Sequence, residues 1–164
     1  MRETYLEYKG KGFWIRSKFV EIVSEQICQA FENLGLAKFN EELLDIYSDC
    51  DSNRNGEKSY GVVNILFDDS VITEDDKNAF LNVCSKAKQL IAAKGQELSV
   101  PTLNAWEQQK LVTYESYTWS IPIKTESLKK TIELFEQLIN ETYPFSNHYI
   151  NYMGFPAHEP HDIL

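Results

Sequence analysis

The chain has 164 residues, of which 43% are hydrophobic and 25% are charged; this composition excludes the disordered and fibrous classes and suits one globular domain. With 16 basic and 25 acidic residues the formal net charge is -9, so the surface repels a phosphate backbone and nucleic acid is not an expected partner. No apolar run approaches the roughly 18 residues that a membrane span needs, and the charged first residues are unlike a signal peptide. We therefore expect a cytoplasmic protein that does not bind a membrane.

The first third of the sequence predicts a strand followed by two helices. Tyrosine and leucine residues before a glycine pair predict an edge strand at 3–9. Apolar residues at steps of three and four predict a long amphipathic helix at 14–34, with Gly35 as its stop. A second, shorter helix is expected to begin after a cap at Asn40 and to end near Ser48.

The middle of the sequence predicts a strand and a capped helix. Turn-forming and charged residues at 49–59 give way to β-branched and aromatic residues at 60–67, which predict a central strand. Thr73, followed by three acidic residues, has the pattern of a capping box and predicts a helix to about Ala93. Gly95 then lies where a left-handed cap is expected.

The last third predicts a short helix, a strand, a long helix and a final strand. Pro101 is expected to open the short helix, and the aromatic and β-branched residues of 112–123 predict the strand. Thr125 is expected to cap the long helix, which ends before Pro144, and a last strand is expected near 149–153.

Taken together, these elements predict an α+β fold. We expect a single domain at 1–155, with a mixed or mostly antiparallel sheet packed with three main amphipathic helices, and a flexible C-terminal tail at 156–164. No internal repeat or linker divides the chain.

One segment matches part of a calcium-binding loop of the EF-hand type. The matches to positions 1, 3, 5, 6 and 9 are Asp51, Asn53, Asn55, Gly56 and Ser59. The twelfth position, which normally supplies a bidentate glutamate, is Val62. Since Asn-Gly sequences form turns without metal, we prefer a metal-free turn and keep a calcium-responsive module as an alternative.

A second glycine-rich motif has the placement of a phosphate site. Gly10, Lys11 and Gly12 lie between the first expected strand and the first expected helix, where backbone amides can bind an anion. The third glycine of a dinucleotide fingerprint is replaced by Ile15. We therefore prefer a flexible turn.

The histidines and cysteines suggest no metal site or catalytic centre. Cys28, Cys50 and Cys84 lie far apart without a CxxC pair, so reduced thiols are expected. His158 and His161 flank a proline, which is incompatible with a helical zinc motif. His148 with a carboxylate supports only the alternative of a small hydrolase-like enzyme, because no nucleophile motif accompanies it. We predict no cofactor, no metal ligand and no catalytic residue.

Two clusters of acidic residues are the candidate partner-binding site. They comprise Asp45, Asp49, Asp51, Asp68, Asp69, Glu74, Asp75 and Asp76. Part of the second cluster is explained by capping of the helix that follows Thr73. The remaining carboxylates suit a basic partner, because opposite charge raises the association rate and favours that partner over neutral ones.

The whole chain resembles bacterial immunity proteins of contact-dependent growth inhibition and related polymorphic toxin systems. The similarity lies in the expected helix around Glu25–Phe31, the DSNRNG loop, the SYGVVNILFDD segment and the TYPFSN turn. It implies a stoichiometric inhibitor, not an enzyme, that covers a surface of a cognate toxin, often a basic nuclease. The free protein is then expected to be a monomer or a weak dimer.

Overall fold

The structure, a computed structural model, describes residues 3–58, 62–111 and 117–150. Its strands are β1 (Glu3–Tyr8), β2 (Lys11–Arg16), β3 (Glu97–Leu98), β4 (Ile123–Lys124) and β5 (His148–Tyr149). Its α-helices are α1 (Ser17–Leu34), α2 (Glu41–Arg54), α3 (Phe67–Ser70), α4 (Glu74–Ala92), α5 (Val100–Gln108) and α6 (Thr125–Ile139), and Leu36–Lys38 form a 3-10 turn. The fold is α+β, as the sequence predicts. The expected tail at 156–164 lies outside the described residues.

The N-terminal strands form a tight hairpin. β1 and β2 pair antiparallel with Tyr8 opposite Lys11, and the two turn residues Lys9 and Gly10 have φ of 49° and 82°. Positive φ at both central residues defines the turn whose twist matches the paired strands. A Cβ at Gly12 would collide with the carbonyl oxygen of Leu6. The glycine motif is therefore part of a hairpin, and the prediction that it leads directly into a helix is wrong.

The sheet is small and mixed. β5 adds parallel to β2, so the strand order is β1-β2-β5, while β3 and β4 form a separate antiparallel pair. The predicted edge position of the first strand is confirmed. The helix expected from residue 14 begins only at Ser17. Phe13 and Ile15 instead belong to strand β2, from which their side chains face the core.

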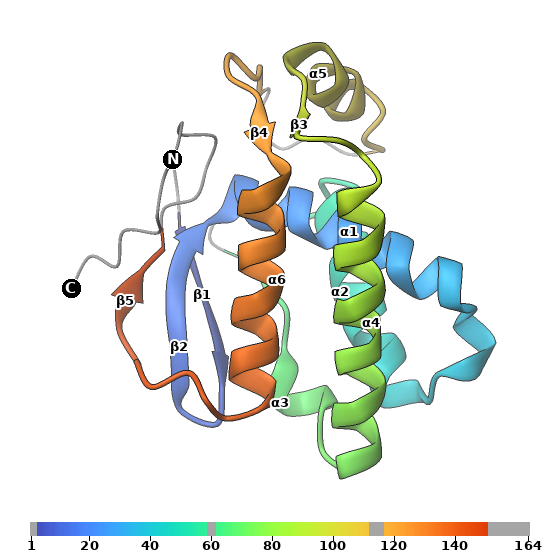
Figure 1. The fold of residues 1–164 in the computed structure, drawn as a ribbon, viewed down its shortest axis with the longest axis vertical. Helices are drawn as coiled ribbons and strands as arrows, with labels where there is room; N and C mark the ends of the chain where they lie inside the picture. Colours follow the sequence, from blue (N-terminus) through green and yellow to red (C-terminus); the bar gives the residue numbers. More distant parts are fainter. Residues whose placement is uncertain (1–2, 59–61, 112–116, 151–164) are drawn as a thin grey trace.

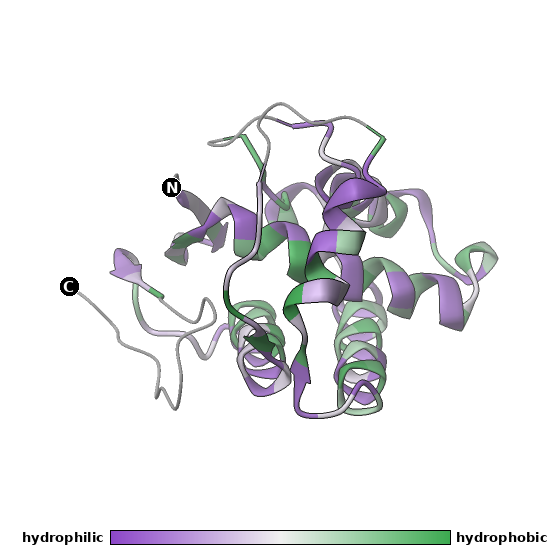
Figure 2. Ribbon diagram, turned by 90° about the horizontal axis from the view of Figure 1, so that it is seen from above, coloured by the Kyte–Doolittle hydropathy of each residue, from purple (hydrophilic) through white to green (hydrophobic). Residues whose placement is uncertain are grey.

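Helix α1 lies at the centre of the helical part. It runs across α4 and α6, which lie side by side, while α2 packs behind it (Figure 1). Hydrophobic residues of α6 turn toward α1 and its hydrophilic residues turn outward (Figure 2). Aromatic rings join these layers, since Phe67 contacts both Phe80 and Phe135 at centroid distances of 5.5 and 5.3 Å.

The central strand predicted at 60–67 is not formed at 62–67, and residues 60 and 61 lie outside the described part. Residues 62–66 have no strand partner, and Phe67 begins the short helix α3. Their burial still alternates, with Val63 and Ile65 buried. The predicted two-residue periodicity is therefore correct, but the backbone of this segment is not hydrogen-bonded to a neighbouring strand. The amide of Asn53 donates to the Asn64 carbonyl at 2.9 Å, and the Leu66 N–H donates to Asp49 at 3.1 Å. Side chains of α2 thus satisfy the backbone that a neighbouring strand would otherwise bond.

The predicted strand at 112–123 is corrected in the same way. Residues 112–116 lie outside the described part, and from 117 to 122 the chain is irregular before the two-residue strand β4. Asn104 on α5 receives a hydrogen bond from the Trp119 N–H at 2.7 Å and donates one to the Trp119 carbonyl at 3.1 Å. One side-chain amide therefore takes the place of a strand partner.

Helix ends follow the predicted caps with two exceptions. The Thr73 side chain accepts from the Asp76 N–H and completes the predicted capping box, and Gly95 has the expected positive φ of 91°. Helix α2 begins at its predicted cap but continues to Arg54, six residues beyond the predicted end at Ser48. Thr125 caps nothing and instead donates to the Gly95 carbonyl at 2.7 Å. No helix among the described residues has the length and apolarity to cross a membrane.

Candidate functional site

The acidic residues predicted to bind a partner form two groups: some make hydrogen bonds or ion pairs within the protein, and others make none that the structure describes. Asp76 is buried and accepts from the N–H groups of Ile72 and Thr73 and from the Asn40 amide. These hydrogen bonds, chiefly that from Thr73, hold its pKa below the usual value. Asp51 pairs with Arg54 at 2.8 Å, and Asp68 accepts from the Lys9 N–H at 2.9 Å. These three carboxylates therefore act within the fold.

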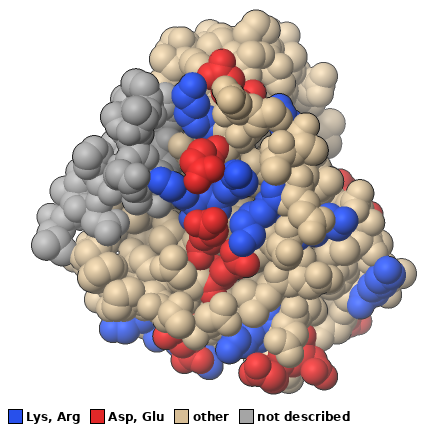
Figure 3. Space-filling view, viewed as in Figure 1, with Lys and Arg blue, Asp and Glu red and all other residues tan. Residues whose placement is uncertain are grey.

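The remaining predicted acidic residues lie on α2, on α3 and at the start of α4. Asp45 and Asp49 are one turn apart on α2, and Leu66, which bonds to Asp49, leads into α3. Acidic side chains gather at the lower edge of the molecule, over the start of α4 (Figure 3). No described hydrogen bond or ion pair engages the side chains of Asp45, Asp69, Glu74 and Asp75.

Large apolar side chains are exposed within the same region. Val62, Leu66 and Ile72 are 57%, 48% and 67% exposed. They lie on the segment that joins α2 to α4, with Asp69 between Leu66 and Ile72 and with Glu74 and Asp75 just after Ile72. We call the acidic face the surface formed by Asp45, Asp49, Val62, Leu66, Asp69, Ile72, Glu74 and Asp75. Exposed apolar groups among charges of one sign are typical of a protein-binding surface.

A second concentration of charge lies inside the molecule. Lys18 and Glu21 of α1 meet Glu107 and Lys110 from the end of α5, and each of these side chains is at most 6% exposed. Opposite charges alternate around a closed ring. Its four distances are 2.8 Å for Lys18–Glu21, 2.8 Å for Glu21–Lys110, 3.0 Å for Lys110–Glu107 and 3.2 Å for Glu107–Lys18. We call these four residues the ionic ring.

Aromatic side chains complete the surroundings of the ionic ring. The Trp119 indole donates to Glu107 at 3.2 Å, and the ammonium groups of Lys18 and Lys110 lie 4.8 and 4.2 Å from the rings of Tyr117 and Trp106. Burial lowers the pKa of Lys110, and the nearby carboxylate of Glu21 opposes that shift. The ring joins α5 and the segment after it to α1.

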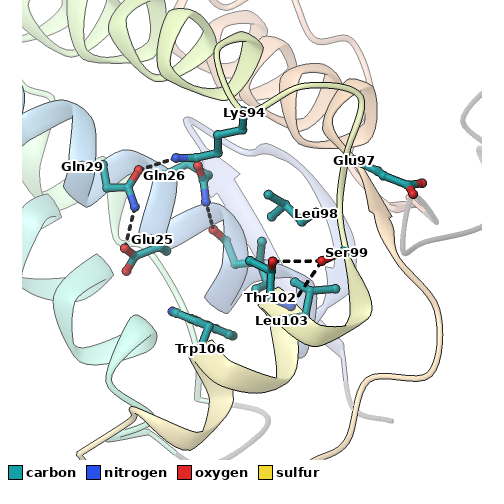
Figure 4. Close-up of a pocket in the computed structure, with 11 residues that line it drawn as sticks. Glu25, Gln26, Gln29, Lys94, Glu97, Leu98, Ser99, Thr102, Leu103 and Trp106 are labelled. Carbon is teal, nitrogen blue, oxygen red and sulfur yellow. Dashed lines mark hydrogen bonds between the residues drawn. The ribbon is translucent and has the colours of Figure 1, made fainter.

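A pocket of about 440 Å³ opens between α1 and α5, beside the ionic ring. Its apolar wall contains Ile22, Leu98, Leu103 and Trp106, and its polar lining includes Glu25, Gln26, Gln29 and Lys94 (Figure 4). The polar groups are linked, because Lys94 donates to Gln29 at 2.7 Å and Gln29 donates to Glu25 at 2.8 Å. Burial lowers the pKa of Lys94.

Sequence reasoning missed both the ionic ring and the pocket. Lys18, Glu21, Glu25 and Gln29 recur at steps of three and four, which in a sequence marks the solvated side of an amphipathic helix. Here α5 covers that polar stripe. The signal that could have found it is the short α5 itself, which carries Trp106, Glu107 and, just beyond its end, Lys110.

The calcium loop and His148 are the alternative sites that fall at least partly within the described residues. The calcium loop is not formed, because Asp51 and Asn53 lie within α2 and the Asn53 amide is buried against Ser24 and Asn64. His148 is buried and stacks on Phe145 at 3.8 Å, and it does not line the α1–α5 pocket. Over the described ranges, no group of three histidine, cysteine or acidic side chains is placed to hold a metal ion. His158 and His161 lie outside these ranges.

The three cysteines are buried and free, as expected for reduced thiols. Cys28 of α1 and Cys50 of α2 are neighbours, and the contact raises the pKa of Cys28. Burial likewise raises the pKa of Cys84. Thiols with raised pKa values are poor nucleophiles at neutral pH, so neither Cys28 nor Cys84 has the environment of a catalytic cysteine.

No protein-family model, curated protein or solved structure matches this chain.

Proposed function

We propose that this chain is an immunity protein: a stoichiometric inhibitor that binds a basic cognate toxin, such as a nuclease, through the acidic face. The observation that carries the proposal is the exposure of Val62, Leu66 and Ile72 in a region where the carboxylates of Asp45, Asp69, Glu74 and Asp75 have no described hydrogen bond or ion pair. Such a surface offers apolar anchors for affinity and a negative field for encounter. The role needs no catalytic residue and no cofactor.

Charge and apolar exposure make separate contributions to this function. The net charge of -9 attracts a basic protein over a distance and raises the association rate, which falls as salt is added. The apolar groups act after contact, because their burial slows dissociation. We expect Ile72, the most exposed of the three, to act as an anchor residue.

The test is protection of cells against the product of the adjacent toxin gene. Co-expression of the wild-type chain should restore growth, and Ile72→Asp should abolish protection and weaken binding by about 30-fold or more, as expected for the loss of an interface anchor. Leu111→Asp is the matched control, since Leu111 is 78% exposed but lies beyond α5. An adjacent gene without toxic product, or equal loss in both variants, contradicts the proposal.

The enzyme alternative has one supporting observation, the α1–α5 pocket, which gathers polar groups from separate elements. Neither His148 nor any cysteine lines that pocket, and its two hydroxyl groups, of Ser99 and Thr102, bond to each other at 2.9 Å, so no described hydrogen bond there joins a hydroxyl to a base. We therefore retain binding as the proposed function.

A further inference from the structure

We propose that the α1–α5 pocket is a binding site for a free α-amino acid with an apolar side chain. This proposal is independent of toxin binding, because the pocket and the acidic face share no residue. Three features of the pocket match the three parts of such a ligand, which are its ammonium, its carboxylate and its apolar side chain.

The first feature is a buried acceptor without a donor. Gln26 is 3% exposed, and in the described structure its Oε1 has no hydrogen-bond partner. Its Nε2 points to the Ile22 carbonyl at 3.4 Å, which fixes the orientation of the amide, because the reverse would place two oxygens together. A buried acceptor that lacks a donor destabilises the free protein. A ligand ammonium can supply that donor beside the Glu25 carboxylate, which lines the same pocket and also pairs with Arg54 at 3.5 Å.

The second feature is the ammonium of Lys94. It enters the pocket from just beyond the end of α4, and its side chain lies beside the Gln26 amide (Figure 4). Its described hydrogen bond is to the neutral amide of Gln29, at 2.7 Å. A charged group whose pKa is lowered by burial gains more from a carboxylate than from an amide. The ligand carboxylate would therefore take the place of Gln29.

The third feature is the apolar wall and the space in front of it. Ile22, Leu98, Leu103 and Trp106 surround a volume of about 440 Å³, at the lower end of the range for small-molecule sites. A leucine or methionine side chain fits against this wall without further polar contacts. The Lys94–Gln29–Glu25 chain of hydrogen bonds separates the positive and negative groups along one side, as a zwitterion requires.

Binding is tested by titrating the whole chain with L-leucine and L-methionine, followed by thermal unfolding and by methyl NMR signals of Ile22, Leu98 and Leu103. We expect saturable binding in the micromolar to millimolar range, and a rise in melting temperature with ligand. N-acetyl-leucine lacks the ammonium and leucinamide lacks the carboxylate, so each should bind at least about tenfold more weakly. Absence of saturable binding by either amino acid overturns the proposal.

The variant Gln26→Leu tests the site itself. It removes the unpartnered acceptor, so the free protein should melt at a higher temperature than wild type while losing the response to leucine. Lys94→Met should reduce leucine binding and leave the weaker leucinamide binding unchanged. Gln137→Leu, the same substitution at an exposed position of α6, is the control and should bind as wild type does. Wild-type binding by Gln26→Leu, or loss of binding in the control, contradicts the assignment.

Discussion

The acidic face and the ionic ring both concentrate charge, but they place it in opposite situations. In the ring, two lysines and two glutamates are buried and every charge contacts its opposites within 3.2 Å. On the acidic face, Asp45, Asp69, Glu74 and Asp75 stand in solvent without a described ion pair, beside exposed apolar groups. Because buried charges must be paired within the fold, the ring is explained by the chain alone. The acidic face is not explained by the chain alone, and for that reason we propose that a partner binds it.

The largest effect is expected when one member of the ionic ring is removed, which tests whether its buried charges depend on one another. Glu107→Gln leaves the two lysines with Glu21 alone, and an unpaired buried charge lowers the free energy of unfolding by about 3–5 kcal/mol. Urea unfolding followed by circular dichroism measures this loss. The control is Glu97→Gln at the exposed pair with Lys124, where we expect less than about 1 kcal/mol.

Replacing all four residues of the ring tests whether the protein needs the buried ion pairs at all, or only needs each buried charge to have a partner. Leucine or methionine at all four positions removes the desolvation penalty along with the attraction, so the fourfold variant should be close to wild type in stability. If the fourfold variant is as unstable as Glu107→Gln, the ring is needed for its shape or hydrogen bonds. The pairing of charges would then not be what distinguishes the ring from the acidic face.

Asp76 tests the boundary between the two regions, because it belongs to the acidic cluster in sequence and to the interior in structure. Asp76→Ala removes the capping box and should destabilise the protein by about 1–2 kcal/mol. The folded pKa of Asp76 lies below its ordinary value of 3.8, so its contribution is complete above that pH and is lost as the pH falls through the folded pKa. The difference between wild type and variant should therefore shrink below about pH 4 in acid unfolding curves.

The exposed neighbour Asp75 is the control for this prediction. Asp75→Ala removes only the interaction of a carboxylate with the helix dipole, which contributes less than about 1 kcal/mol at an exposed position. Equal effects of the two substitutions would show that Asp76 contributes through the dipole and not through its hydrogen bonds.

The sequence predicts what is local and misses what depends on distant partners. The capping box at Thr73 and the helix opened by Pro101 are confirmed because a few neighbouring residues determine them. The predicted strands are wrong at 62–67 and at 117–122, the residues outside β4 that the structure describes in these two segments, because alternating burial does not reveal what bonds to the backbone. In the described parts of both segments an asparagine side chain from a helix does so.

The same limit applies to the sites. The sequence locates the acidic clusters, but only the structure shows that Asp76 and Asp51 are engaged within the fold while Asp45 is not. The ionic ring joins residues 89 positions apart, so its polar members on α1 look solvated until α5 is placed over them. Gln26 has the same appearance, since nothing in the sequence shows that it is buried.

The smallest expected effect on stability is that of Asp45→Asn, and whether this substitution stabilises or destabilises the protein is informative. Asp45 is exposed on α2 with Glu41 and Asp49 four residues to either side, and like charges at that spacing repel by about 0.2–0.5 kcal/mol per pair. Asp45→Asn should therefore stabilise the protein by a few tenths of a kcal/mol in urea unfolding at low salt. It should also slow association with the toxin, measured by stopped flow at several salt concentrations. The control, Glu133→Gln on α6, should leave association unchanged. A charge that destabilises its own helix but speeds association contributes to binding. If Asp45→Asn instead destabilises the protein, Asp45 stabilises the fold, as the charges of the ionic ring do.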